Sequence, residues 1–328
     1  MNKVIRWGIL GASKFAREQM GPAIHSARGA QLVALASGSP DKAQAFVDMV
    51  PGLRVYADYD ALLANPDIDA VYIPLPNHLH VQWSKRALNA GKHVLCEKPI
   101  AMAADEIDDL IALRDKTGLH IAEAFMIVHH RQWQRARELV QTGAIGTLMH
   151  VEGTFAYNNA GDTANVRQKP EFGGGGIPDI GVYTYGATRW VTGQEPVAIT
   201  HADLTFENGV DVVARVSARF DGFSAHWVNS MRMHPVQDMA FIGDQGIVKL
   251  TAPFNPQRFG EARVELHQNG MAVRVERFPA DNHYINQVEA FGETVRNGAP
   301  YAWPLEQARG TQAMIDAVFA KAREGENA

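Results

Sequence analysis

The sequence predicts an α/β protein: an N-terminal doubly wound parallel sheet, followed by an α+β domain with a large, mostly antiparallel open sheet. Two observations predict it. Up to about residue 122, short apolar runs alternate with helical stretches, which is typical of parallel strands joined by helices. From about residue 145 onward, strand-like runs follow one another through short turns, as antiparallel strands do. We therefore expect domains at residues 1–122 and 123–328.

In the first domain, each expected strand is a short apolar run. Glycine ends two of the intervening helices, at Gly91 and Gly118. The strands are expected at residues 4–10, 32–36, 70–73, 93–96 and 120–122, and the helices at 13–26, 41–47, 79–90 and 104–117.

In the second domain, Asn208-Gly209 and Asp221-Gly222 are the turn pairs of hairpins. One face of such a sheet packs on its own helices, and the other must be wet or covered. We favour a partner subunit, hence a homodimer or homotetramer through this sheet. The strands are expected at residues 148–157, 197–206, 210–220, 223–230, 237–242, 247–250, 263–267 and 272–278, and the helices at 128–142, 179–192, 284–297 and 305–323.

Composition limits the function. The 328 residues carry a net charge of −5, which gives no basic footprint for nucleic acid. The single cysteine, Cys96, fits a reducing compartment, and neither a secretory signal nor a membrane-spanning apolar run is visible. A cytoplasmic enzyme with a small-molecule substrate is the expectation.

The first strand leads into a glycine-bearing turn and then a helix, which is the order of the dinucleotide-binding fingerprint. Gly11 and Ala16 take the outer positions of the fingerprint, and Ser13 stands in place of the middle glycine. Gly8 lets the strand lie close to a helix. The alternative is a turn that merely tolerates small residues. The expected cofactor contacts here are Gly8, Gly11, Ala12, Ser13, Phe15 and Ala16.

The second strand ends at Ser37, where an NAD enzyme usually has an acid that binds the ribose diol. Gly38, Ser39 and Lys42 follow. Hydroxyls and an ammonium suit a 2′-phosphate, so we favour NADP over NAD, although Asp41 argues mildly against it. The alternative role for Ser39 or Asp41 is helix capping.

The third strand is followed by Leu75, Pro76 and Asn77, and then by His78 and His80 in the first turn of a helix. The two histidines are two residues apart and point to different faces, and no further ligand set accompanies them, so we expect no metal. We count Leu75, Pro76, Asn77 and His80 among the cofactor contacts. Helix capping and packing are the alternative.

The fourth strand is followed by Glu97-Lys98-Pro99. Proline ends the strand, so Lys98 is left at its tip, where the ligand crevice of a parallel sheet opens. A lysine there can exchange a proton with a substrate hydroxyl or carbonyl. Glu97 and Lys98 are therefore expected beside the cofactor. The alternative is a solvated loop lysine.

Taken together, segments 8–16, 76–80, 90–99 and 174–183 resemble the Gfo/Idh/MocA oxidoreductase family, which includes glucose-fructose oxidoreductase and dimeric dihydrodiol dehydrogenase. The resemblance covers nearly the whole chain. It implies a Rossmann domain, a second domain whose open sheet often forms the dimer face, and hydride transfer between NAD(P) and a carbinol carbon, usually of a sugar or cyclitol.

The resemblance also assigns residues. Lys98 matches the family lysine, commonly in a cis link to proline, and Asp179 matches the family aspartate. Tyr183 stands where many members have histidine, as in the glucose-fructose oxidoreductase and dihydrodiol dehydrogenase branch, which commonly uses NADP. Ile127-Val128 replaces a frequent Tyr-Arg pair, so the substrate-facing wall differs. Arg167 lies in a segment where relatives often have Asn-Ile-Arg.

From these residue types we expect a phenolate at Tyr183 to take the proton of the substrate hydroxyl. The ammonium of Lys98 is expected to lower the pKa of the Tyr183 phenol. Asp179 lies four residues before Tyr183, on the same helix face, and can orient the substrate or Lys98. Packing of an aromatic ring is the alternative for Tyr183. The expected substrate-binding residues are Lys98, Met126, His129, Arg167, Asp179 and Tyr183.

Two other hypotheses stay open at this stage. One is a non-catalytic NAD(P)-binding sugar sensor, although such a protein is expected to lose the lysine or the tyrosine. The other is a reductase of a less polar cyclic substrate, which Ile127-Val128 would suit.

Overall fold

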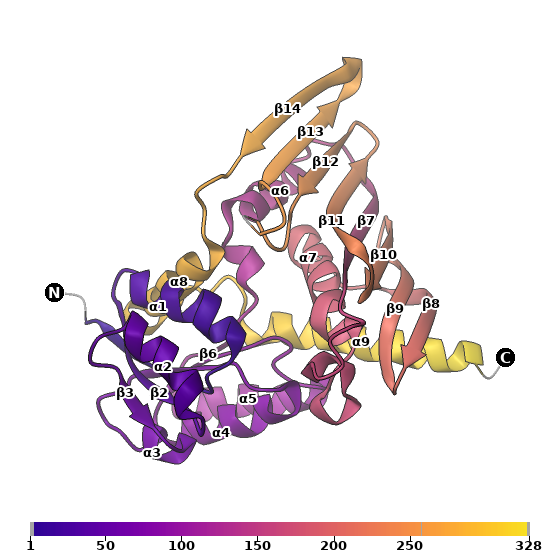
Figure 1. The fold of residues 1–328 in the computed structure, drawn as a ribbon. Coiled ribbons are helices and arrows are strands. Elements are labelled where there is room, and N and C mark those ends of the chain that lie inside the picture. The colour runs from indigo at the N-terminus through magenta and orange to yellow at the C-terminus, as the bar shows by residue number, and fades with distance from the viewer. Residues whose placement is uncertain (1–2, 257, 327–328) are drawn as a thin grey trace. The chain divides into compact units, whose positions relative to one another are not determined.

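A computed structural model describes residues 3–256 and 258–326. It divides into two compact units (Figure 1). The first takes in the chain up to His129 together with Asn282–Arg309, and the second takes in His130–Asp281 and the chain from Gly310 onward. The first unit thus includes a segment from late in the sequence. The domain boundary expected after residue 122 stays a prediction.

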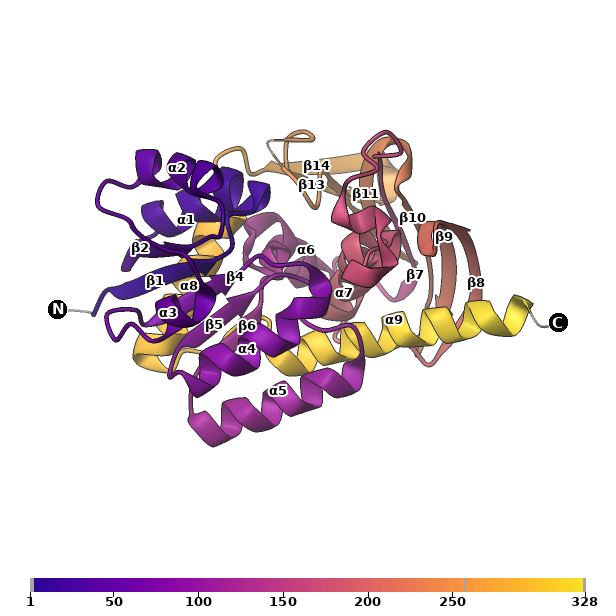
Figure 2. The same ribbon diagram turned by 60° about the horizontal axis from the view of Figure 1, so that its bottom comes forward.

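The first unit contains a six-stranded sheet in the order β3-β2-β1-β4-β5-β6, with every pair parallel. Figure 2 shows α1 and α2 on one face of this sheet and α4 and α5 on the other, which confirms the doubly wound prediction. The strands are β1 (Ile5–Leu10), β2 (Ala30–Ala36), β3 (Arg54–Tyr56), β4 (Ala70–Ile73), β5 (His93–Cys96) and β6 (Ile121–Glu123). The helices are η1 (Ala16–Met20), α1 (Gly21–Ser26), α2 (Pro40–Met49), α3 (Tyr59–Leu63), η2 (Asn77–Leu79), α4 (His80–Asn89), α5 (Ala104–Thr117), η3 (Met126–His129) and α8 (His283–Asn297).

The strand order reverses between β1 and β4, which makes this position a topological switch point. The segments that follow the strands all lie at the carboxyl-terminal end of the sheet. Gly11, Ser37 and Glu97 each directly follow a strand at this end. Parallel βαβ connections therefore bring together segments that are far apart in the chain.

The late segment of the first unit is held by aromatic packing. Phe291 of α8 lies 4.8 Å from Trp7 of β1, measured between ring centroids. Trp303 stacks on Phe125 at 4.1 Å. All four rings are buried, so a large apolar area ties residues near the end of the chain to the first sheet.

The second unit contains an eight-stranded sheet in the order β14-β13-β12-β11-β7-β10-β9-β8. It is mostly antiparallel, as predicted; the β7–β10 pair is parallel. The strands are β7 (Leu148–Asn158), β8 (Ala198–Glu207), β9 (Val210–Arg219), β10 (Ser224–Ser230), β11 (Arg232–Gly243), β12 (Gly246–Thr251), β13 (Arg263–Gln268) and β14 (Ala272–Arg277). The helical segments are α6 (Arg131–Gln141), η4 (Val166–Gln168), η5 (Pro170–Phe172), η6 (Ile177–Gly181), α7 (Val182–Thr192) and η7 (Asn269–Met271). Helix α9 (Leu305–Glu326) begins in the first unit and continues into the second.

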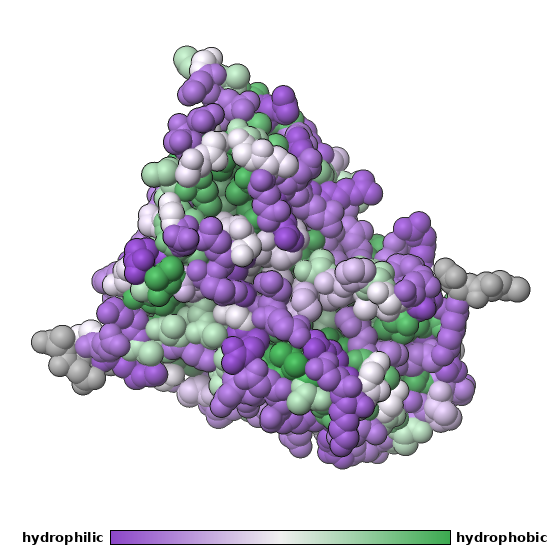
Figure 3. Space-filling model, turned by 180° about the vertical axis from the view of Figure 1, so that it is seen from behind, coloured by the Kyte–Doolittle hydropathy of each residue, from purple (hydrophilic) through white to green (hydrophobic). Residues whose placement is uncertain are grey.

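The two faces of this sheet differ. One packs against α6 and α7 (Figure 1). The buried rings of the sheet include Trp227 and Phe241. On β14, Val273 and Val275 are 51% and 44% exposed. Seen from behind, apolar side chains lie among polar ones in the upper part of the picture, where β13 and β14 lie (Figure 3). The face away from the helices is therefore mixed in character.

Within residues 3–256 and 258–326, no helix is both long and apolar enough to cross a membrane. The same residues bring together no group of three His, Cys, Asp or Glu side chains that could hold a metal ion.

Candidate functional site

The turn after β1 requires glycine at its first position. Gly11 has φ +108°, and a Cβ there would lie 2.9 Å from a methyl group of Leu75. Ser13 has a local structural role, because its hydroxyl accepts a hydrogen bond of 3.0 Å from the amide of Ala16. The serine thus caps the first helical turn at the position where the fingerprint has a glycine. Gly8 packs against Leu62 of α3, where a Cβ would lie 2.8 Å from a methyl carbon.

The tip of β2 is built from serine hydroxyls. Ser37 is buried, and its hydroxyl contacts both the amide and the carbonyl oxygen of Ser39 at 3.1 Å. The hydroxyl of Ser39 accepts from the amide of Lys42 at 3.4 Å, so the capping alternative for Ser39 is realised. Nothing lies within 4 Å of a Cβ built at Gly38, and the Lys42 side chain is exposed. The tip therefore offers open space beside one ammonium.

His80 connects two of the strand tips. It is fully buried, and its ring nitrogens lie 2.7 Å from the carbonyl oxygens of Pro99 and Leu75. Burial lowers the pKa of His80, while the two carbonyl contacts raise it. The imidazole therefore links the segment after β4 to the turn that follows Lys98. Whether His80 contacts a cofactor stays a prediction.

Lys98 lies on a turn that is fixed on several sides. The Lys98–Pro99 peptide bond is cis, as the family resemblance implied. The buried carboxylate of Glu123, at the end of β6, accepts hydrogen bonds from the amide of Ile100 at 2.9 Å and the indole of Trp303 at 2.8 Å. Burial raises the pKa of Glu123, and the nearby ammonium of Lys98 lowers it. Glu123 was not predicted from the sequence, although an acid that ends an apolar strand is a usable signal.

Glu97, just before Lys98, is also held in place. The phenol of Tyr72 donates a hydrogen bond of 2.6 Å to its carboxylate. Tyr72 is fully buried, and burial followed by the charge of Glu97 raises its pKa well above the usual value. A protonated phenol is therefore the donor. Glu97 is partly exposed at the edge of the sheet where the cofactor contacts were expected.

In the second unit, two polar side chains meet at the carboxylate of Asp179 in η6: Arg167, which was predicted, and Tyr157, which was not. This carboxylate accepts from the phenol of Tyr157 at 2.6 Å and pairs with Nε of Arg167 at 2.7 Å. Asp179 raises the pKa of the Arg167 guanidinium, and burial followed by Asp179 raises that of the Tyr157 phenol. The Arg167 side chain is 42% exposed, so this cluster faces solvent on one side.

Tyr183 lies near the start of α7, about one helical turn after Asp179. It is 6% exposed, and its ring lies 5.8 Å from Phe155 and 5.7 Å from Phe254. The packing alternative for this ring is therefore realised. Its phenol also acts on the Arg167 guanidinium, whose pKa it helps to raise. Tyr183 thus belongs to the same polar cluster as Asp179 while being held by apolar neighbours.

Met126 and His129 lie in η3 of the first unit, with 3% and 5% of their surfaces exposed. Burial lowers the pKa of His129 to about 3, so its imidazole is neutral. Its ring packs 5.0 Å from that of Tyr301. A role for either residue in substrate binding stays a prediction.

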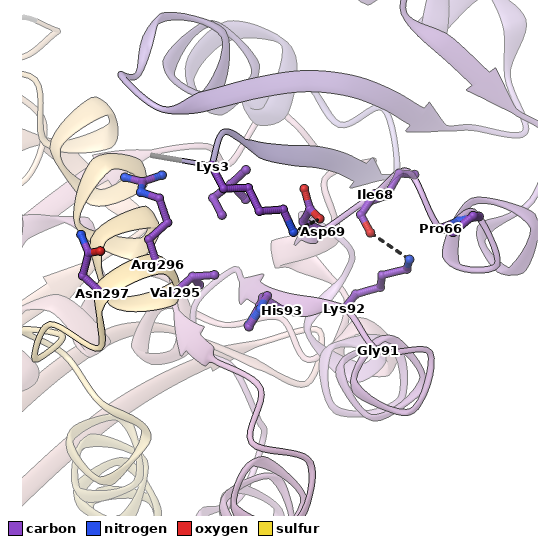
Figure 4. Close-up of a pocket in the computed structure, with 11 residues that line it drawn as sticks. Lys3, Pro66, Ile68, Asp69, Gly91, Lys92, His93, Val295, Arg296 and Asn297 are labelled. Atoms are coloured by element: carbon purple, nitrogen blue, oxygen red, sulfur yellow. Dashed lines mark hydrogen bonds and ion pairs between the residues drawn. The ribbon is translucent and has the colours of Figure 1, made fainter. Parts of the chain in front are cut away.

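A pocket of about 540 Å³ opens at the end of the first sheet where the strands begin, opposite the carboxyl ends that carry Gly11, Ser37 and Glu97. It lies where β1 and β5 begin (Figure 4). Its charged groups are already engaged. The Lys92 ammonium donates to the carbonyls of Asn65 and Ile68 at 2.7 and 2.8 Å, and Lys3 pairs with Asp69 at 3.1 Å. In open α/β sheets, ligands bind at the carboxyl ends of the strands, so we do not place the cofactor here.

Comparison with known proteins agrees with this geometry. Residues 5–125 match the family model "Oxidoreductase family, NAD-binding Rossmann fold". Residues 133–249 match the model of the GFO/IDH/MocA C-terminal domain. The two matches fall on the two halves of the chain that the sequence rhythm separated.

Three similar proteins cover nearly all of the chain. An uncharacterised oxidoreductase of Rhizobium meliloti is 36% identical over 98% of each protein. A D-xylose 1-dehydrogenase (NADP(+)) of Haloferax volcanii is 30% identical over 97% of this chain and 98% of its own. The crystal structure of KijD10, a 3-ketoreductase from Actinomadura kijaniata in complex with NADP and TDP-benzene, superposes with a TM-score of 0.88 at 29% identity, over 97% of each chain.

Proposed function

Since the chain belongs to the GFO/IDH/MocA oxidoreductase family, we propose that it transfers hydride between NADP and a carbinol or carbonyl carbon of a sugar or related polyol. The observation that carries the proposal is Lys98, at the carboxyl end of β5, on a turn fixed by His80 and Glu123. A lysine fixed there can act on a substrate oxygen. Relatives named as D-xylose 1-dehydrogenase (NADP(+)) and as dTDP-3,4-didehydro-2,6-dideoxy-alpha-D-glucose 3-reductase support the substrate class.

The residues at the first strand tips fit a dinucleotide. Gly11 provides the tight turn, Gly38 leaves open space, and Lys42 provides an ammonium for a 2′-phosphate. No acid stands at Ser37, where a ribose diol would be bound in an NAD enzyme. These features support NADP over NAD. The bound nicotinamide supplies the chemistry of hydride transfer.

In the proposed mechanism, the chain's own residues handle the proton and the orientation of the substrate. The phenol of Tyr183 exchanges a proton with the reacting hydroxyl at its Oη, and the ammonium of Lys98 stabilises the negative charge that develops on oxygen. Asp179 pairs with Nε of Arg167 and accepts the hydrogen bond of Tyr157, which leaves the terminal N–H groups of Arg167 to donate to sugar hydroxyls. The proton transfer and the binding of sugar hydroxyls are thus assigned to different groups.

A less polar cyclic substrate is the second candidate. The rings of Phe155, Phe254 and Tyr183 pack together in the second unit with at most 6% of any of them exposed, and an apolar cluster that includes Tyr183 suits a substrate whose ring has an apolar face. Ile127 and Val128 are completely buried in the first unit, so they do not themselves support this candidate. A substrate panel that includes cyclic diols separates this candidate from a sugar enzyme.

We also propose that the chain forms a homodimer or homotetramer through the sheet of the second unit. The exposed Val273 and Val275 on β14 support an interface that covers the mixed face. Light scattering at micromolar concentration is expected to give a multiple of 36.0 kDa, and a 36.0 kDa particle would contradict this proposal.

The proposed function is tested by absorbance at 340 nm. Pentoses, hexoses and cyclitols are each mixed with the purified chain and either NADP or NAD. We expect reduced cofactor to form with at least one sugar, faster with NADP. Binding of a sugar and cofactor with no turnover in either direction would instead support a sensor.

A further inference from the structure

Asp211 is a buried acid with no place in the proposed mechanism. It is the second residue of β9 and is 2% exposed, between Val210 and Val212, which are also buried. A buried carboxylate is costly unless hydrogen bonds or charge partners compensate it. Its partners are therefore informative about its role.

The carboxylate of Asp211 lies against the glycine run that precedes Asp179. Its Oδ2 accepts a hydrogen bond of 2.7 Å from the amide of Ile177, and the amide of Gly176 also bonds to the carboxylate. A Cβ at Gly175 would lie 2.3 Å from Oδ1, and one at Gly176 would lie 3.1 Å from Oδ2. The glycines thus make the space that the carboxylate occupies.

The same short segment is bonded to both polar partners of the candidate site. The amide of Gly175 donates to the carbonyl of Arg167 at 3.0 Å, and the amide of Asp179 donates to the carbonyl of Gly175 at 3.2 Å. A shift of this segment would therefore move the backbone of Arg167 and Asp179 together. Tyr183 follows on the helix that begins here.

We propose that Asp211 is a positioning residue: its carboxylate, bound to the amides of Gly176 and Ile177, holds the helical turn that places Asp179 and Tyr183 for the reaction. This inference rests on the proposed function, because it concerns the same site. It assigns a role to the glycine run beyond the conformational freedom of the turn. Asp211 itself contacts neither substrate nor cofactor in this account.

The hold is expected to depend on pH. Burial raises the pKa of Asp211 to about 7; Asp179 adds to this rise, and the amide hydrogen bonds oppose it. The titratable groups acting on it are Asp179 of η6 and Tyr185 of α7. Because the folded chain holds this pKa above that of an exposed aspartate, the fold favours the protonated carboxyl, whose carbonyl oxygen still accepts from the amides. The turn is therefore held most firmly below about pH 7, and the hold weakens as the pH rises through that value.

Hydrogen exchange of peptides spanning residues 174–183 tests the proposal without any substrate. In the unmodified chain, after correction for intrinsic rates, we expect protection to rise as the pH is lowered from about 8.5 to 5.5. In Asp211→Asn, whose amide nitrogen cannot accept a backbone hydrogen bond, protection is expected to be about tenfold lower at pH 5.5 and independent of pH. Asp203→Asn is the matched control, because Asp203 pairs with Arg215 on the neighbouring strand and is half exposed. Unchanged exchange in Asp211→Asn would overturn the proposal.

Activity provides the second measurement. We expect kcat of Asp211→Asn to be about tenfold lower than that of the unmodified chain at pH 5.5 and nearly equal to it at pH 8, with KM for NADP within twofold. A loss by the same factor at every pH would indicate a structural role and would contradict positioning that depends on the protonation of Asp211. If the unmodified chain turns over no sugar, the proposed function fails, and the exchange measurement still decides whether Asp211 holds the turn.

Discussion

The phenol of Tyr157, near the end of β7, donates a hydrogen bond of 2.6 Å to the carboxylate of Asp179. The other oxygen of that carboxylate pairs with Arg167, so both oxygens already have partners. Asp179 is therefore better suited to hold donors in place than to act as a general base. This gives Tyr157 a role in presenting the substrate-binding groups.

Tyr157→Phe removes one hydrogen bond to a charged group while keeping the ring. We expect kcat/KM for the sugar to fall about tenfold, mainly through KM, because the lost bond orients Asp179 and Arg167. Steady-state kinetics at saturating NADP measure it. Unchanged kinetics would show that the Tyr157–Asp179 bond does not serve the substrate.

Tyr183→Phe is expected to lower kcat by about a hundredfold or more with a smaller change in KM, because the phenol acts in the transition state. The phenylalanine ring can keep the contacts with Phe155 and Phe254. The matched control is Tyr185→Phe, on the same helix, since the buried phenol of Tyr185 has no hydrogen-bond partner within residues 3–256 and 258–326. A change in KM alone for Tyr183→Phe would make it a binding residue.

Ser37→Asp places a carboxylate at the tip of β2, where we expect the 2′-phosphate. Repulsion is expected to weaken NADP binding by roughly ten- to a hundredfold, the scale of a charge-assisted contact of about 1.5–3 kcal/mol. NAD binding is expected to hold or improve. Titration of both cofactors measures this, with Lys42→Met as a second variant that weakens NADP alone. Tighter binding of NAD than of NADP by the unmodified chain would overturn the assignment.

His129 links stability to pH. Its pKa is lowered by burial from 6.5 to about 3, so the unfolded chain takes up a proton first as the pH falls. The neutral form of His129 contributes its full stability above pH 6.5, and this contribution is lost as the pH falls toward about 3. At pH 5 the loss amounts to about 2 kcal/mol of unfolding free energy.

Because Asp211 acts in the opposite direction, the effect of His129 is measured as a difference between variants. When the pH is lowered from 7 to 5, the unfolding free energy of the unmodified chain is expected to decrease by about 2 kcal/mol more than that of His129→Gln. Urea titrations at both pH values measure it. An identical pH dependence in the two proteins would show that His129 is protonated in the fold.

The sequence predicted the elements that local pattern determines. The apolar runs that end in glycine or proline became β1, β4 and β5, and the Asn208-Gly209 and Asp221-Gly222 pairs became hairpin turns. Strand β3 and helix α3, of three and five residues, were not predicted, because so short an element shows no periodicity. The return of residues 282–309 to the first unit depends on contacts such as Trp7–Phe291, which no local window contains.

In the candidate site, too, the sequence predicted residues that belong to a local motif and missed those that act through long-range contacts. Lys98 and Asp179 lie in recognisable segments, so they were predicted. The partners that hold them were not: Glu123 and Tyr157 lie near strand ends, and Asp211 sits between valines, where a buried acid resembles any other strand residue. The bonds of Glu123 to Ile100, Tyr157 to Asp179 and Asp211 to Ile177 span 22 to 34 residues, and the bond of Glu123 to Trp303 spans 180. Such long-range pairs become visible only when the fold is known.

Under the proposed function, Lys98 takes part in the chemical step of hydride transfer between NADP and a sugar. The most direct test compares the unmodified chain with Lys98→Met at 340 nm, with the best sugar of the panel and saturating NADP. We expect the variant to bind NADP within a few-fold of the unmodified chain and to turn over about 10²–10⁴ times more slowly, because the positive charge that stabilises the reacting oxygen and supports proton transfer by Tyr183 is lost. Equal turnover in the two proteins would contradict the account.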